Sequence, residues 1–304
     1  MLDPNTPTIR TDLAVEARQL SRERAGELTE LPGIRASDTT AEGFPVSVVE
    51  VLDGRGEKAI GKPVGRYVTL ELDALMRRED SAFSRGVRAL AALIHDFLPE
   101  GFSGDCLVVG LGNREITPDA VGPLTAEHVL ATRHLKVQLP RDFAAFRSVS
   151  AVCTGVLGTT GIESGDFVRA LAQELEPGLV FAVDALASRS MDRLCRTVQL
   201  SDTGIVPGSG VGNARLALNR ESLGVPVIAI GVPTVVDAAT LTLDLAGRAG
   251  ISLKPESFGP LGGMIVTPRD IDRSVRDVGK LIGYGLNMAF HDGLTVEEMD
   301  MLLS

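Results

Sequence analysis

Acidic and amide side chains follow three apolar runs in the middle third of this 304-residue chain. The runs cover residues 106–112, 179–184 and 196–201. Each run ends in, or is followed by, carboxylate or amide groups, which belong to Asn113 and Asp119, to Asp184, and to Asp202. In an open α/β sheet, chemistry collects at the carboxyl ends of the strands, where loops lead into helices. The pattern therefore predicts a site whose tools are carboxylates rather than a nucleophilic serine or a metal ion.

The two acids Asp119 and Asp184 each have a structural and a catalytic interpretation. In TPDA, Thr117 can cap a helix and Pro118 suits its first position. Asp119 then falls in the first turn, where an acid complements the helix dipole. Asp184 ends an apolar strand, and desolvation there favours a raised pKa and work as a general acid. Arg189 could instead neutralise Asp184 in a structural ion pair.

Glycine-rich loops lie near these acids in the sequence. Residues 155–166 (GVLGTTGIESGD) combine glycines with a helix start, and Thr160 and Glu163 have capping-box spacing. Exposed N–H groups there could bind an anion or a substrate backbone, although the segment is neither a P-loop nor a nucleophile elbow. GLGN at 110–113 is interpreted as a tight turn, because the dinucleotide fingerprint fails at Glu115.

A second loop, at 201–213, begins with the tripeptide Asp202-Thr203-Gly204, which also occurs in pepsin-type active sites. The pepsin fold is all-β, unlike the alternating pattern of this chain. The rest of the loop, PGSGVGN, is again rich in backbone N–H groups, and Asn213 and Arg215 either orient a substrate or end the loop.

Alternating helical and strand patterns surround these residues. Helices are predicted at 14–30, 81–98 and 268–291, with another beginning at Thr234, and N-terminal strands at 44–53 and 67–72. Strands and helices alternate from about residue 106 onward. Such alternation predicts a doubly wound sheet behind a β-rich N-terminal part, with a boundary near residue 78.

Composition excludes several functional classes. The chain is 44% hydrophobic with no Trp and two Tyr, so an aliphatic core of a parallel sheet is expected. A net charge of -10 disfavours a nucleic-acid-binding surface. No apolar stretch reaches the ~18 residues of a membrane span, and the first residues lack the apolar region of a secretory signal. We therefore expect a cytoplasmic chain with no nucleic-acid and no membrane partner.

Cysteine and histidine patterns predict neither a metal site nor a cofactor. Buried free thiols are expected at the three widely spaced cysteines, Cys106, Cys153 and Cys195. The four histidines form no pair with the spacing of zinc ligands. His128 and His134 are expected on different faces of one helix.

Several longer blocks together resemble the germination proteases of endospore-forming bacteria. The blocks are TDLAVEA (11–17), GLGNREITPDAVGP (110–123), TRHL (132–135), GVLGTTGIES (155–164), VDALASRS (183–190), SDTGIVPGSGVGN (201–213) and LGVPVIAIGVPTVVDA (223–238). They occur in the family's order, and the resemblance runs from about residue 8 to residue 291.

The resemblance implies a fold similar to that of the hydrogenase-maturation proteases, a doubly wound, mostly parallel sheet with an added N-terminal β-rich subdomain. It implies a propeptide at 1–12 and a peptidase domain at 13–304, divided into a β-rich part, 13–78, and an α/β core, 79–304. Family members are homotetrameric endopeptidases without a cofactor, made as zymogens in the forespore. They begin the degradation of small acid-soluble spore proteins at germination.

The resemblance also implies residue roles. The family's two aspartates map onto Asp119 in TPDA and Asp184 in VDALA. The family cuts its substrates after Glu and before a bulky apolar residue, with a small residue and a further acid following. Residues 12–16 (DLAVE) repeat this pattern with Asp12 in the place of Glu, so self-cleavage is predicted between Asp12 and Leu13. Substrate-binding residues are predicted in the matched blocks at Asn113, Thr159, Thr160, Arg189, Asp202, Ser209 and Asn213.

An acid before the scissile bond needs a basic pocket, for which Arg114, Arg189 and Arg215 are the candidates. Our mechanistic hypothesis makes Asp119 the base that activates water and Asp184 the acid that protonates the leaving group, with loop N–H groups stabilising the oxyanion. Three alternatives stay open. They are a metal-assisted peptidase of the maturation-protease fold, a glycine-rich binding module, and a pepsin-like dyad that uses Asp202.

Overall fold

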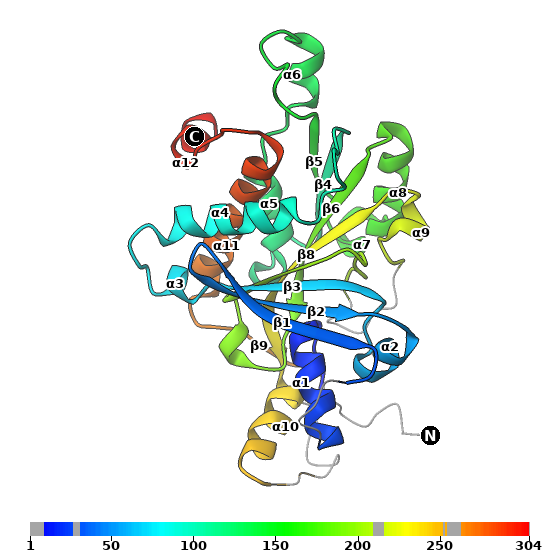
Figure 1. Ribbon diagram of the computed structural model, residues 1–304, viewed down its shortest axis with the longest axis vertical. Coiled ribbons are helices and arrows are strands. Elements are labelled where there is room, and N and C mark those ends of the chain that lie inside the picture. Colours follow the sequence, from blue (N-terminus) through cyan, green and yellow to red (C-terminus); the bar gives the residue numbers. More distant parts are fainter. Residues whose placement is uncertain (1–8, 27–30, 209–215, 252, 254–262, 304) are drawn as a thin grey trace.

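One sheet of nine strands crosses the part of the chain that the computed structural model describes, residues 9–26, 31–208, 216–251, 253 and 263–303. The strand order is β1-β2-β3-β7-β8-β6-β4-β5, and β9 pairs with β8 (Figure 1). The strands are β1 (Ile34–Ala41), β2 (Phe44–Val51), β3 (Gly65–Glu71), β4 (Cys106–Gly110), β5 (Val149–Cys153), β6 (Leu179–Ala187), β7 (Thr197–Ser201), β8 (Val227–Asp237) and β9 (Ile265–Val266).

The parallel half of the sheet consists of β5, β4, β6 and β8. Every residue of β4 is buried, and so is every residue of β6 except Ala185. Successive β4 residues, such as Leu107 and Val108, point to opposite faces of the sheet and belong to separate apolar clusters. Burial on both faces is what a doubly wound sheet requires, and the predicted α/β class is confirmed.

The N-terminal strands continue this sheet through β7, which runs antiparallel to both of its neighbours. Tyr67 of β3 pairs with Ser201 of β7, and Gln199 of β7 pairs with Gly231 of β8. The sheet is therefore mixed rather than mostly parallel, because the pairs among β1, β2, β3, β7 and β8 are antiparallel. The β-rich N-terminal part and the α/β core share backbone hydrogen bonds across one sheet.

Helices cover both faces of the sheet. The larger apolar cluster joins the sheet to α4 (Ala82–His95), α5 (Val121–Glu127) and α11 (Ile271–Phe290). On the other face α8 (Ser164–Leu175) packs on β4 and β6, and α1 (Ala14–Ala25) and α2 (Gly54–Ile60) pack near β2 and β3. The remaining helices are α3 (Asp73–Met76), η1 (Thr117–Asp119), α6 (Arg133–Gln138), α7 (Leu157–Thr160), η2 (Met191–Arg193), α9 (Arg220–Leu223), α10 (Ala238–Arg248) and α12 (Val296–Leu302).

Several predicted boundaries are wrong. α1 ends at Ala25, before the predicted residue 30, because Gly26 takes the left-handed conformation that ends a helix. β8 continues through Pro233, and α10 begins at Ala238 rather than Thr234, because the Asp237 carboxylate accepts from the Thr240 N–H and caps the helix there. β1 was not predicted, since a single buried residue leaves it without an alternating apolar pattern.

Three predicted side-chain environments are also wrong. Cys153 is exposed, whereas Cys106 and Cys195 are buried as expected. His128 follows α5 and His134 lies in α6, so the two do not share a helix. The Thr160 hydroxyl donates to carbonyls of its own turn and forms no capping box with Glu163. No helix within the described residues combines the length and the apolar character that crossing a membrane requires.

Candidate active site

Asp184 lies in β6, opposite Gly231 of β8, and is almost completely buried, with 4% of its surface exposed. The Ala185 N–H donates to its Oδ1 over 2.9 Å. Burial raises the pKa of Asp184 to about 8, the charge of Asp119 adds to the rise, and the hydrogen bond from Ala185 opposes it. Asp184 therefore holds a proton at neutral pH. The sequence predicted that the strand ends at Asp184, but it continues to Ala187.

Asp119 ends the short helix η1, which follows β4. Its Oδ2 accepts the Asn113 N–H over 2.8 Å, and its own N–H donates to the Ile116 carbonyl over 2.7 Å. Gly112 has a φ of +106°, and a Cβ there would lie 2.1 Å from the Asp119 carbonyl oxygen. Only glycine permits this loop, which turns the Asp119 carboxylate back toward the end of β4.

Two side-chain hydrogen bonds connect η1 to the rest of the fold. The buried Thr234 hydroxyl of β8 donates to the Pro118 carbonyl over 2.7 Å. The Thr117 hydroxyl donates to Asp272 Oδ1 of α11 over 2.7 Å. The sequence suggested that Thr117 caps a helix. Thr117 does not do so, and its hydroxyl instead joins η1 to α11.

Both carboxyl groups line one cavity of about 290 Å³. Its lining is largely apolar and is contributed by Leu111, Gly112, Ile116, Pro118, Asp119, Val156, Ser164, Asp184, Ala185, Leu186, Ala187, Pro207, Gly208, Thr234, Val235 and Ile265. Apolar walls lower the local dielectric and strengthen the interaction of the two acids. A carboxyl that keeps its proton beside a second carboxyl can give and take protons during attack by water.

The loop residues predicted to bind substrate lie around this cavity rather than in its lining. The Asn113 side chain accepts from the Glu115 N–H in a local turn, so its backbone rather than its amide reaches Asp119. Thr159 and Thr160 are exposed in α7, directly after Val156, which lines the cavity. Both threonine N–H groups donate to the Val156 carbonyl.

Asp202 lies away from the two acids. β6 runs parallel to β8, whereas β7 runs antiparallel to it. The carboxyl end of β7 therefore points in the opposite direction to the carboxyl end of β6. Asp202 is exposed, and its Oδ1 accepts the Arg66 N–H over 2.8 Å. Ser209, Asn213 and Arg215 lie outside the described residues.

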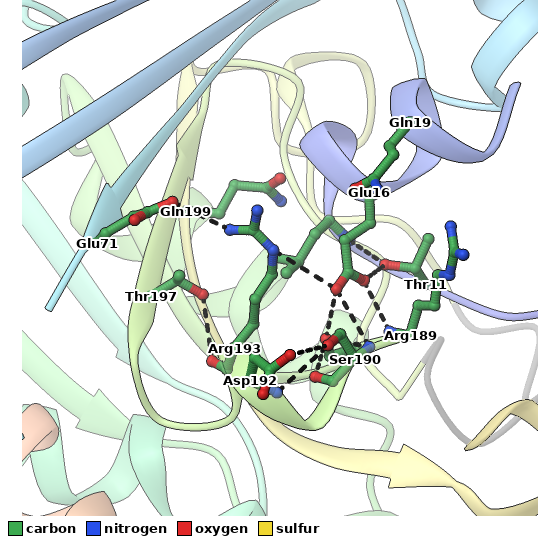
Figure 2. A network of polar contacts seen from close by, with 12 residues as sticks. Thr11, Glu16, Gln19, Glu71, Arg189, Ser190, Asp192, Arg193, Thr197 and Gln199 are labelled. Carbon is green, nitrogen blue, oxygen red and sulfur yellow. Dashed lines mark hydrogen bonds and ion pairs between the residues drawn. The ribbon is translucent and has the colours of Figure 1, made fainter. Parts of the chain in front are cut away.

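Two of the arginines proposed for a basic pocket, Arg114 and Arg189, have other partners. Arg114 pairs with Glu127 on the surface. Arg189 pairs with the buried Asp244 and with Glu23, so it does not neutralise Asp184. Arg189 instead lines a separate polar cavity of about 480 Å³, next to the network of Figure 2.

The predicted cleavage junction lies directly beside the carboxylate cavity. The Asp12 N–H donates to the Ala187 carbonyl over 2.9 Å, and Asp12 Oδ2 accepts the Ala187 N–H over 2.8 Å. Leu13 is completely buried. Asp12 lines a neighbouring cavity of about 250 Å³, and Leu186 lines both cavities.

Lys62 is a residue of this region that the sequence analysis missed. Its Nζ lies 3.5 Å from the Thr11 carbonyl oxygen, and it lines the same cavity as Asp12. Burial lowers the pKa of Lys62, whereas the charges of Asp12 and Glu16 raise it. Nothing local marked Lys62, because its partners are about fifty residues earlier in the chain.

Among the residues that the structure describes, no group of three His, Cys, Asp or Glu side chains is arranged to hold a metal ion. The described residues of the candidate site are the two acids, the apolar walls of the cavity and the peptide segment beside them.

Comparison with known proteins defines the family to which this chain belongs. The family model described as germination protease matches residues 14–248, which include Asp119 and Asp184. The chain is a peptidase. It belongs to the germination protease family.

Curated relatives match nearly the whole chain. The germination protease of Caldanaerobacter subterraneus subsp. tengcongensis is 43% identical over 97% of this chain and 98% of its own. That of Clostridium perfringens is 38% identical, over 97% and 99%. That of Halalkalibacterium halodurans is 37% identical, over 96% of both chains. A solved NiFe hydrogenase maturation protease from Thermococcus kodakarensis is 18% identical, with a TM-score of 0.36, and covers 64% of this chain and 98% of its own.

The raised pKa of Asp184 predicts a pH-dependent stability. In the unfolded chain this carboxyl ionises near pH 4, whereas the folded protein keeps its proton to about pH 8. Its contribution to the free energy of unfolding therefore falls as the pH rises between these values. In chemical denaturation, Asp184→Asn should gain stability relative to the parent by roughly 1 kcal/mol per pH unit in this range.

The exposed acid Asp202 provides the control for this measurement. Asp202→Asn should keep the pH dependence of the parent. A stability difference between Asp184→Asn and the parent that does not change with pH would contradict a protonated Asp184.

Proposed function

We propose that this peptidase is a spore endopeptidase of the aspartic type, made as a zymogen, that cleaves its own chain between Asp12 and Leu13. The observation that carries the proposal is one cavity that holds Asp119 and Asp184, with the junction bound to Ala187 at its edge. Asp184 and Ala187 belong to the same strand, so the acid and the bound segment are connected rigidly.

Asp119 and Asp184 divide the proton transfers of hydrolysis. Water adds to the peptide carbonyl carbon as its proton moves to the Asp119 carboxylate. Asp184 then gives its proton to the departing amide nitrogen, and the C–N bond breaks. Burial and the charge of Asp119 raise the pKa of Asp184, so Asp184 keeps the proton that it donates in this step.

The position of the junction supports synthesis as a zymogen. Asp12 lines the cavity next to the carboxylates, with Leu186 between, and its carbonyl oxygen lies 3.3 Å from Gln199 Nε2. Self-cleavage therefore requires residues 11–13 to move past Leu186 into the carboxylate cavity. The Asp12–Leu13 bond lies beside the two acids and not between them, so we expect it to be cleaved slowly.

Lys62 and the Ala187 N–H are the groups that we propose recognise the acid before the scissile bond. The N–H already binds the Asp12 carboxylate, and the Lys62 ammonium lines the same cavity. They take the place of Arg114 and Arg189, which the sequence suggested and which pair with Glu127, Asp244 and Glu23.

Family membership supports the remaining parts of the proposal. The substrates would be the small acid-soluble proteins of the spore, the compartment would be the forespore and spore core, and the assembly would be a homotetramer. These follow from kinship with the germination proteases and not from the geometry of the site.

Asp119→Asn and Asp184→Asn should each slow self-cleavage by about 100-fold or more, because each removes a proton-transfer group. Intact mass and N-terminal sequencing of the full chain over time will show whether a Leu13 terminus forms. Asp202→Asn is the matched control and should process at the rate of the parent. Processing at that rate by either of the other two variants would remove its carboxyl from the mechanism.

Lys62→Gln should lower kcat/KM by about tenfold or more for a peptide with Asp or Glu before the scissile bond, the equivalent of losing about 1.4 kcal/mol of binding. The same peptide with Gln at that position should be cut equally by the variant and the parent. Lys58→Gln removes an exposed lysine of α2 and is the control. An equal loss on both peptides would mean that Lys62 does not select the acid.

A further inference from the structure

Glu16 is a buried acid in the first turn of α1, with 2% of its surface exposed. Figure 2 shows its carboxylate at the centre of a polar network. Oε1 accepts from the Ser188 hydroxyl over 2.8 Å and lies 3.7 Å from Arg193 Nε. Oε2 accepts the Arg189 N–H over 2.7 Å and also the Thr11 hydroxyl.

The Thr11 hydroxyl connects Glu16 to the predicted cleavage point. It donates to Glu16 Oε2, and it accepts the Leu13 N–H over 3.1 Å. Leu13 is the N-cap residue of α1 and Glu16 occupies the third helical position. An acid at that position commonly bonds the N-cap N–H directly in a capping box. Here a hydroxyl from outside the helix lies between the two groups.

Hydrolysis after Asp12 would change both ends of this bridge at once. Thr11 leaves with the released peptide, so Glu16 Oε2 loses a donor and the nitrogen of Leu13 loses its acceptor. That nitrogen also becomes an α-ammonium on a residue with no exposed surface. A positive charge at a helix N-terminus is unfavourable, and a buried one is costly unless an anion pairs with it.

We propose that Glu16 is the receptor for the α-ammonium that processing creates at Leu13. The proposal rests on the proposed self-cleavage between Asp12 and Leu13. The ligand is the amine of this chain, and Oε2, the oxygen that Thr11 vacates, accepts it. The pair replaces the bridged contact of the unprocessed chain with a direct, charged capping box.

This receptor connects the new terminus to the active site. The same carboxylate accepts from Ser188 and from the N–H groups of Arg189 and Ser190, which directly follow β6. β6 carries Asp184 and Ala187. Pairing with the ammonium therefore keeps α1 attached to the end of that strand after the propeptide has gone.

The test compares Glu16→Gln in the processed and the unprocessed chain. Each pair of proteins has Glu16 in one member and Glu16→Gln in the other. Asp119→Asn keeps the first pair unprocessed, and self-cleavage, verified as a Leu13 terminus by sequencing, supplies the processed pair. Glu16→Gln should lower the melting temperature of the processed chain by about 5 °C or more beyond its effect on the unprocessed chain. The added loss arises because only the processed chain has an ammonium to leave unpaired.

A second comparison makes the position of the amine the variable. Fusion proteins can be cleaved so that the new chain begins with either Leu13 or Gly-Leu13. The ammonium then lies at the receptor in the first protein and one residue, about 3.8 Å, away from it in the second. The added glycine should lower the melting temperature in the Glu16 protein and leave it unchanged in Glu16→Gln. Equal effects of Glu16→Gln on both chain forms, or of the glycine in both backgrounds, would overturn the proposal.

The two proposals fail in different ways. If the full chain never acquires a Leu13 terminus, self-cleavage is the part that fails, and the fusion-derived Leu13 chain still tests Glu16. If the terminus forms but Glu16→Gln affects both forms equally, self-cleavage stands and the receptor is rejected.

Discussion

The burial of one carboxyl beside another is the interaction on which the rest of this structure depends. Asp184 is nearly inaccessible to water, and Asp119 lines the same apolar cavity. A lone carboxylate in such a place would cost several kcal/mol of solvation. The fold meets this cost by leaving the proton on Asp184, whose pKa rises to about 8. A proton held at neutral pH is also what a general acid requires.

Close backbone packing brings the two acids together. A Cβ on Gly110 would lie 2.3 Å from the Gly122 carbonyl oxygen, and a Cβ on Gly122 would lie 2.5 Å from that of Val183. β4, α5 and β6 therefore touch through their backbones next to Asp184, and Gly112 turns the chain back at Asp119. The glycines of the GLGN segment permit this close approach of the backbones. From the sequence alone, GLGN could be interpreted only as a tight turn.

The sequence pointed to residues of the candidate site where local signals agree with the topology, and not where contacts between distant parts of the chain decide. Asp119 follows β4 and Asp184 lies near the carboxyl end of β6, which runs parallel to β4, so the rule about strand ends applied to both residues. Asp202 follows β7, and nothing local revealed that this strand runs antiparallel. The roles proposed for Lys62 and Glu16 rest on contacts with residues 11–13 and 188–190, which only the folded chain brings together.

The measurement that bears most directly on the paired acids is a titration of aspartate carboxyl carbons by ¹³C nuclear magnetic resonance. Comparison of the parent with Asp184→Asn identifies the resonance of Asp184. We expect that resonance to move with a midpoint near pH 8, far above the ordinary value for aspartate. A midpoint near pH 4 would mean that Asp184 is ionised at neutral pH, and the division of proton transfer between Asp184 and Asp119 would be wrong.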